Sequence, residues 1–137
     1  MTNSDIFNIV AFEIFHKCSG VFPIPVEFEA KVIAKDVSGY FDMSEDEAVL
    51  DLQQNKIFDV VNHTSSWLIT EGFLQYHGSS ADGVFVTFTL QGLNAINKCP
   101  HSLGSKKSFK EILINGLVSV SFSTASGLMV ELFKGGN

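Results

Sequence analysis

Two cysteine–histidine pairs contain the side chains best suited to metal chemistry: His16 with Cys18, and Cys99 with His101. Two cysteines and two histidines form a common ligand set for zinc. Residues two positions apart on a helix, however, point to different faces, and zinc motifs usually have wider spacings. We therefore expect buried thiols and surface imidazoles here, with no metal site and no cofactor.

Other catalytic patterns are missing from the sequence. It has no Gly-x-Ser-x-Gly, and the segment from Gly116 to Gly127 lacks the lysine and the spacing of a phosphate-binding loop. The carboxylates Glu45, Asp46 and Glu47 precede a predicted helix, where the helix dipole favours negative charge. These observations predict a protein that is not an enzyme.

The composition predicts one globular domain with a substantial core. The chain has 137 residues, of which 45% are hydrophobic and 13 are Phe. A core of this size cannot enclose so many phenylalanines, so we expect a subunit interface as well. The apolar stretch from Ile6 to Phe15 contains Glu13 and follows no basic segment, which is unlike a signal peptide. With only two cysteines, the pattern favours a cytoplasmic protein with reduced thiols.

Hydrophobic periodicity and turn residues predict a mainly helical α+β protein. Residues 48–52 could begin a helix or a strand, and the pattern leaves both open. Ser44 and Glu47 resemble a capping box, and Thr89 is suited to cap the helix that follows it. The predicted helices cover residues 5–17, 26–36, 55–71 and 90–97, and the predicted hairpin strands begin at Phe73 and cover residues 84–88.

One stretch resembles the winged-helix superfamily. A helix ends in Trp67-Leu68 and is followed by Gly72-Phe73, and after a hairpin Phe88-Thr89 leads through Gly92 into the next helix. The resemblance implies a winged helix-turn-helix-like domain over residues 1–101. We expect residues 102–137 to form a C-terminal helical extension that packs on this domain or on a partner subunit.

The resemblance implies that the helix over residues 55–71 is a recognition helix. Its exposed face would then contact nucleic acid or a protein partner, because such polar side chains can bind base edges. Lysines after the domain would be the contacts to phosphate. The candidate face consists of Asn55, Lys56, Asn62, His63, Ser66 and Thr70, and the candidate phosphate contacts are Lys106, Lys107 and Lys110.

The distribution of charge argues against DNA. Residues 1–97 contain four lysines and 13 acidic residues, a net charge of −9, whereas residues 98–137 have a net charge of +3. The sequence contains no arginine, and Asp59 lies on the candidate face. Affinity for duplex DNA depends largely on Lys and Arg that neutralise phosphates. A DNA-binding transcriptional regulator is therefore the second hypothesis.

The C-terminal segment from Ile112 to Val130 has 19 uncharged residues, close to the length of a membrane span. Six polar residues dilute its hydrophobicity, so we predict a packed helix instead. A strand over residues 117–122 and peripheral membrane attachment remain open as alternatives. One broad apolar face of this helix would provide the contacts of a dimer. The residues on this face are Phe109, Ile112, Leu113, Leu117, Val120, Leu128 and Leu132.

The leading functional hypothesis from the sequence is a non-catalytic interaction module that forms a homodimer through this C-terminal segment. The apolar face would supply most of the free energy of docking. The opposite charges of the acidic body and the basic segment would favour the same contact.

Overall fold

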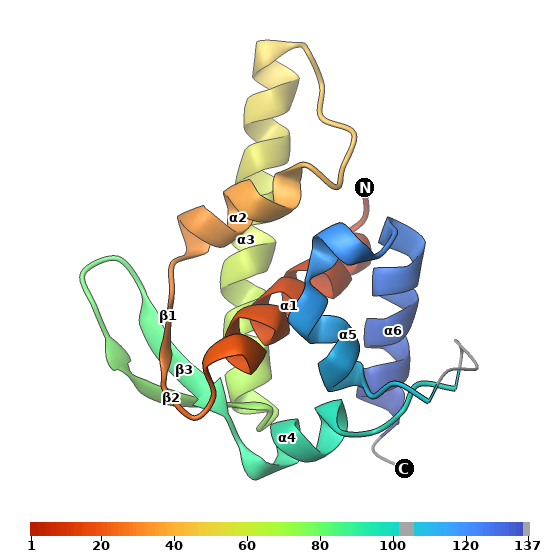
Figure 1. The fold of residues 1–137 in the computed structure, drawn as a ribbon. Coiled ribbons are helices and arrows are strands. Elements are labelled where there is room, and N and C mark those ends of the chain that lie inside the picture. Colours follow the sequence, from red (N-terminus) through yellow and green to blue (C-terminus); the bar gives the residue numbers. More distant parts are fainter. Residues whose placement is uncertain (102–105, 136–137) are drawn as a thin grey trace.

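The computed structural model describes residues 1–101 and 106–135 and shows a mainly helical α+β protein (Figure 1). The predicted fold class is thus confirmed at this level. The predicted boundary at residues 101–102 adjoins residues 102–105, which lie outside the described part. In chain order the elements are α1 (Asn3–Val21), β1 (Val26–Phe28), α2 (Ala30–Ser38), α3 (Glu47–Thr70), β2 (Leu74–Ser79), β3 (Val84–Phe88), α4 (Leu90–Ile96), α5 (Phe109–Asn115), the 3-10 helix η1 (Leu117–Ser119) and α6 (Phe122–Lys134).

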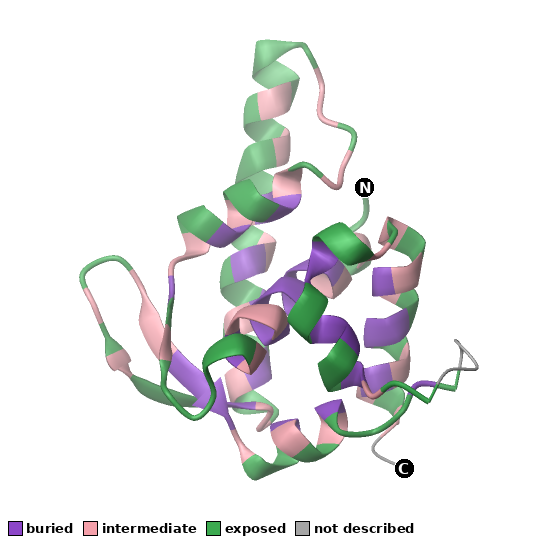
Figure 2. Ribbon diagram, in the orientation of Figure 1, coloured by how far each residue is buried: buried purple, intermediate pink, exposed green. Residues whose placement is uncertain are grey.

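Helix α1 forms the centre of the molecule. Every residue from Ile9 to Phe15 is buried, so this stretch of the helix has no solvent-exposed face (Figure 2). A helix that is hydrophobic all round must be covered by other elements on all sides. At its start, Thr2 and Asp5 form a capping box, in which each side chain accepts a hydrogen bond from the other's backbone N–H.

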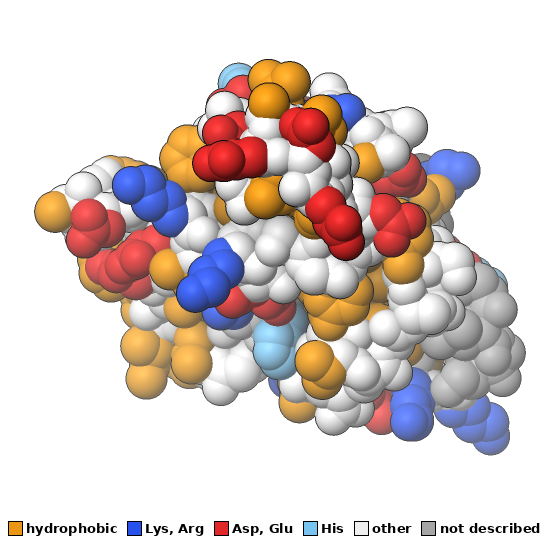
Figure 3. All heavy atoms as spheres, turned by 90° about the horizontal axis from the view of Figure 1, so that it is seen from above, with side chains coloured by type: hydrophobic (Ala, Val, Ile, Leu, Met, Phe, Trp, Pro, Cys, Tyr) orange, Lys and Arg blue, Asp and Glu red, His pale blue; other side chains and the backbone are white. Residues whose placement is uncertain are grey.

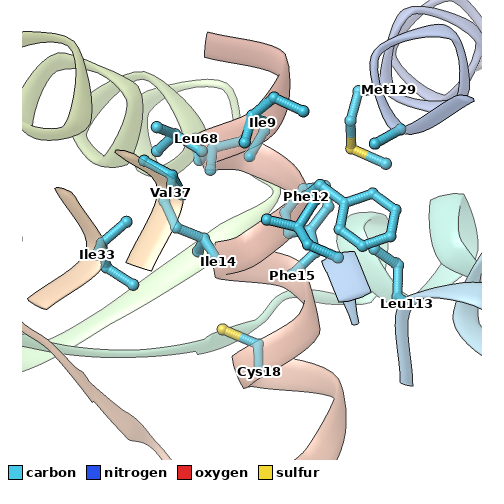
Figure 4. Packing of buried hydrophobic residues seen from close by; sticks show 14 of the residues in the cluster. Ile9, Phe12, Ile14, Phe15, Cys18, Ile33, Val37, Leu68, Leu113 and Met129 are labelled. Atoms are coloured by element: carbon cyan, nitrogen blue, oxygen red, sulfur yellow. The ribbon is translucent and has the colours of Figure 1, made fainter. Parts of the chain in front are cut away.

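Two groups of helices cover α1 from opposite sides. Figure 4 shows Ile33, Val37 and Leu68 of α2 and α3 on one side, and Leu113 and Met129 of α5 and α6 on the other. Helices α2, α3, α5 and α6 all contact α1. Complete burial of a leucine or phenylalanine side chain contributes about 1.5–3 kcal/mol relative to exposure, so this shared core dominates stability.

The three strands form one antiparallel sheet in the order β1-β3-β2. The predicted hairpin is present as β2 and β3. Residues 26–36 were expected to form one helix, and this prediction is wrong in its first part. Val26 pairs with Val86 and Phe28 with Val84, so residues 26–28 form a strand and α2 begins only at Ala30. The edge of β3 supplies hydrogen bonds that local sequence does not reveal.

Helix α3 decides the conformation of residues 48–52, which the sequence left open. One helix of 24 residues runs from Glu47 to Thr70 and includes them. Its cap is the carboxylate of Asp46, which accepts from the backbone N–H of Val49 (3.1 Å). The Ser44 hydroxyl instead accepts from the N–H of Asp46 (3.0 Å), so the predicted capping box does not form at this helix.

The C-terminal segment is not one long helix. Gly116, with φ of 78°, ends α5, and a 3-10 turn separates it from α6. A residue with a Cβ atom rarely adopts this φ, so the glycine favours the break. Ser121 then caps α6 by accepting from the N–H of Thr124 (3.2 Å). The strand considered for residues 117–122 is absent from these described residues, and none of the described helices is long and apolar enough to cross a membrane.

The predicted dimer contacts of this segment lie in the chain's own core. Val120 is half-buried, and the other six are almost completely buried against the rest of the same chain. They cover α1, which leaves them unavailable to a second copy. The expectation that they form a dimer interface is corrected accordingly. The six buried residues are Phe109, Ile112, Leu113, Leu117, Leu128 and Leu132.

Thr89 and Gly92 connect the hairpin to α4. As the sequence predicts, Thr89 caps the start of this helix. The Thr89 hydroxyl accepts from the N–H of Gly92 (3.0 Å) and lies within hydrogen-bond distance of the carbonyl oxygens of Gly72 and Phe73. A Cβ atom on Gly92 would overlap the carbonyl oxygen of Phe73. Only glycine therefore allows this close approach of α4 to the start of β2.

We predict that Gly92→Ala lowers the free energy of unfolding by about 1–3 kcal/mol, because the backbone must move to admit the methyl group. Urea titration followed by circular dichroism measures the change. Gly127→Ala is the matched control, since Gly127 is exposed within α6 and has open space around its Cα. This control should raise stability by about 0.5–1 kcal/mol. Equal stabilities of the two variants would contradict the packing described here.

Candidate interaction groove

A groove lies where the start of α1 meets α3. Its volume is about 770 Å³, which is large enough to receive several side chains of a partner. Helix α1 contributes Asn3, Ser4 and Phe7 to its walls. The apolar residues that α3 contributes are Leu52, Val60 and Trp67, and the polar ones are Asn55, Lys56, Asp59, His63 and Thr64.

Aromatic rings form one end of the groove. The Trp67 ring makes edge-to-face contacts with Phe7 and Phe133, each with ring centroids 5.3 Å apart. It also stacks on Phe73 at 6.1 Å. Such pairs favour offset and edge-to-face geometry and hold the rings in place. Trp67 is 39% exposed, so it forms the boundary between core and groove.

The polar side chains of the groove differ in exposure and in hydrogen bonding. Asp59 and His63 are exposed to solvent. Lys56 is also exposed, and its Nζ donates to the backbone carbonyl of Met1 (2.8 Å). The Thr64 hydroxyl is buried at the wall, and among the described residues it has no hydrogen-bond partner. A buried hydroxyl without a partner costs about 1–3 kcal/mol.

The first half of α3 projects from the body of the molecule (Figure 1). None of the residues from Glu47 to Lys56 is buried (Figure 2). Leu52 is 70% exposed. An isolated helix of this length is marginally stable in water, and packing usually stabilises it. The projecting half of α3 therefore presents apolar surface that the chain itself leaves uncovered.

Acidic side chains surround this projecting end. Figure 3 looks down on it and shows acidic groups gathered there. The exposed acidic residues at or near the start of α3 are Asp42, Glu45, Asp46, Glu47 and Asp51. Such a concentration of negative charge repels polyanions and favours partners that are neutral or basic at the matching position.

The predicted face of the recognition helix is exposed, and the groove includes half of it. Asn55, Lys56 and His63 line the groove. The other three candidates, Asn62, Ser66 and Thr70, are exposed on α3 but do not line it.

The lysines proposed to contact phosphate lie elsewhere. Lys106, Lys107 and Lys110 are exposed at and just before the start of α5. Figure 1 places that segment away from the projecting half of α3. The structure therefore does not bring these lysines together with the candidate face.

Sequence reasoning missed the apolar part of the groove. Leu52 fell in the segment whose conformation was undecided, and Phe7 and Trp67 were assigned to helices without a common surface. Extending the helix back to Glu47 would have placed Leu52 one turn before Lys56 on the same side. The approach of Phe7 from α1 has no signal in the local sequence.

The two cysteine–histidine pairs do not form a metal site in the described structure. Cys18 is buried and Cys99 is exposed. Burial raises the pKa of the Cys18 thiol to about 12. The Cys99 thiol donates to the carbonyl of Lys106 (3.3 Å). Within residues 1–101 and 106–135, no group of three or more His, Cys, Asp or Glu could hold an ion.

Glu13 is a buried carboxyl group on the central helix, outside the groove. It is 9% exposed, and burial raises its pKa above the ordinary value of 4.5. The nearby charges of Lys17 and His16 act in the opposite direction, and Asp36 acts in the same direction as burial. The folded protein therefore holds the Glu13 proton more tightly than the unfolded chain does.

No protein-family model matches the chain, and no curated protein and no solved structure is significantly similar to it. The geometry of the groove and the distribution of charge are therefore the basis for a functional interpretation.

The raised pKa of Glu13 leads to a prediction about pH. The protonated Glu13 side chain contributes to the free energy of unfolding below about pH 4.5, and this contribution is lost as the pH rises through the folded-state pKa. Glu13→Gln cannot ionise. The free energy of unfolding of the wild type should therefore fall relative to that of Glu13→Gln as the pH rises. Urea unfolding between about pH 5 and about pH 8 measures it. Glu45→Gln removes a charge from an exposed position and should not reproduce this trend. Parallel pH profiles of wild type and Glu13→Gln would contradict the assignment.

Proposed function

We propose that this protein is a non-catalytic interaction module with a winged-helix-like scaffold, and that it docks a protein partner on the α3 groove. The observation that carries the proposal is the uncovered apolar surface along α3. Leu52 is 70% exposed and Trp67 is 39% exposed on one continuous groove. Exposed apolar surface with a polar rim is typical of protein interaction sites. Tryptophan is enriched among the residues that dominate binding energy at such sites.

The order of elements supports a winged-helix-like scaffold. The chain proceeds through α1, β1, α2 and α3 to the β2–β3 hairpin, and β1 pairs with β3. Gly72 and Thr89 occupy the positions that carry the resemblance in the sequence, at the two ends of the hairpin. The connection between α2 and α3 is a departure. It spans residues 39–46, whereas DNA-binding helix-turn-helix motifs have a turn of about three or four residues.

Charge favours a protein partner over DNA. The start of α3 would lead into the major groove if α3 were a recognition helix. That end carries Asp46, Glu47 and Asp51, and Lys56 is the only lysine of the helix. At the tip of the hairpin, Asp82 adds a further negative charge. Each of these carboxylates would approach phosphates and weaken binding.

A DNA-binding transcriptional regulator remains the alternative function. The exposed polar side chains of α3 favour it, since Asn55, Asn62 and His63 can form hydrogen bonds with base edges. This alternative requires that the lysines of the protein outweigh its acidic groups at the contact. The two functions differ in their dependence on salt, which provides a test.

We predict that the protein does not bind random duplex DNA at about 50 mM salt, because the acidic end of α3 repels phosphates. Fluorescence anisotropy of a labelled duplex at about 50 mM and about 200 mM salt measures this. Micromolar binding that weakens steeply with salt, and that Lys56→Glu abolishes, would overturn the proposed function in favour of the regulator. Lys35→Glu reverses an exposed charge on α2 and is the matched control.

A further inference from the structure

We propose that the partner in the α3 groove is a second copy of this chain, whose own α3 lies antiparallel across it. This inference rests on the proposed docking function and names its occupant. The resulting contact is isologous, which means that the same surface of each copy meets the other across a two-fold axis. Such a surface must be complementary to itself, and the charged residues Lys56 and Asp59 of the groove satisfy this requirement.

The exposed side of α3 presents one stripe of side chains along the helix. Val49, Leu52, Lys56, Asp59 and His63 follow one another at intervals of three, four, three and four residues, which places them on the same face. Two of the five are apolar and three are polar or charged. All five residues are exposed in the single chain, and all but Val49 line the groove.

The charges on this stripe select an antiparallel arrangement. Lys56 and Asp59 are three residues apart, so a two-fold axis that crosses α3 between positions 57 and 58 places each Lys56 opposite the other copy's Asp59. Two favourable pairs then form. In a parallel arrangement Lys56 would face Lys56 and Asp59 would face Asp59, and like charges across an interface oppose association.

The same axis arranges the rest of the helix favourably. Leu52 of each copy lies opposite His63 of the other. His63 belongs to the C-terminal half of α3, which ends near the aromatic residues Trp67 and Phe7. Residues 60–70 contain no Asp, Glu, Lys or Arg. The acidic start of each α3 therefore lies beside an uncharged part of the other helix. In a parallel pair the two acidic starts, each with Glu47 and Asp51, would lie side by side.

The contacts already made in the single chain are compatible with this pairing. Lys56 donates to the carbonyl of Met1, but an ammonium group has three protons, so it can also donate to a carboxylate of the second copy. The pairing would also cover the projecting half of α3, which the chain itself leaves exposed.

The first test is the effect of Leu52→Glu on the mass in solution, measured by sedimentation equilibrium. We expect the wild type to be a dimer and Leu52→Glu to raise the dimer dissociation constant more than about tenfold, because it replaces the exposed apolar side chain of the contact with a charge. Leu90→Glu is the matched control: Leu90 is 75% exposed and does not line the groove, and this variant should remain a dimer. Because both side chains are exposed, circular dichroism should show both variants folded.

The second test reverses the charges. Lys56→Glu and Asp59→Lys should each weaken the dimer, since each creates two repulsive pairs, and the double variant K56E/D59K should recover it. An equimolar mixture of the two single variants should also associate, because each supplies the charge that the other lacks.

Three outcomes would overturn the inference: a wild type that is monomeric, a dimer that Leu52→Glu leaves intact, or single charge reversals without effect. If the wild type is a monomer and does not bind DNA, the second copy is not the partner, but the proposed docking function still stands and requires a different protein. Salt-sensitive DNA binding would instead overturn the proposed function, whatever the oligomeric state.

Discussion

The structure depends on the burial of α1 on every side. The seven residues from Ile9 to Phe15 have no exposed face, and one of them is the carboxylic acid Glu13. A helix of this kind cannot be accommodated at the surface of a two-layer domain, because one face would remain in water. It requires helices on both sides, and the chain provides α2 and α3 on one and α5 and α6 on the other.

This constraint explains why the C-terminal segment folds onto its own chain. Its apolar side chains are buried against α1, and Gly116 allows the segment to bend into two shorter helices. His16 of α1 is linked to this segment through a hydrogen bond with the carbonyl of Leu113 (2.6 Å). A surface that forms the core in this way cannot also form the contact between two copies.

The same constraint determines which side of α3 remains available. Burial of α1 uses the side that contains Ile57, Val61, Thr64 and Leu68. The opposite side keeps its apolar and charged residues exposed, and Trp67 lies at the boundary, held by Phe7 and Phe133 from two other helices. The groove is thus a consequence of how α1 packs, since its second wall is the start of α1 itself.

Several elements can be predicted from strong local signals in the sequence. The apolar run at the start predicts α1, and Thr89 and Gly92 predict the start of α4. The turn-rich stretch before Val84 predicts the hairpin, and the charges of the two parts of the chain argue against DNA. Local signals are sufficient here because caps, turns and periodicity depend on residues a few positions apart.

Other features depend on contacts between residues that are distant in the sequence. Residues 26–28 form a strand because β3 offers them an edge, and the C-terminal helices pack in their own chain because α1 needs a second cover. The groove exists because Phe7 and Trp67, 60 positions apart in the sequence, meet at one surface. Hydrophobicity favours the burial of a side chain, but it is non-directional and does not specify the partner. The choice among chemically equivalent apolar faces depends on the arrangement of the whole chain.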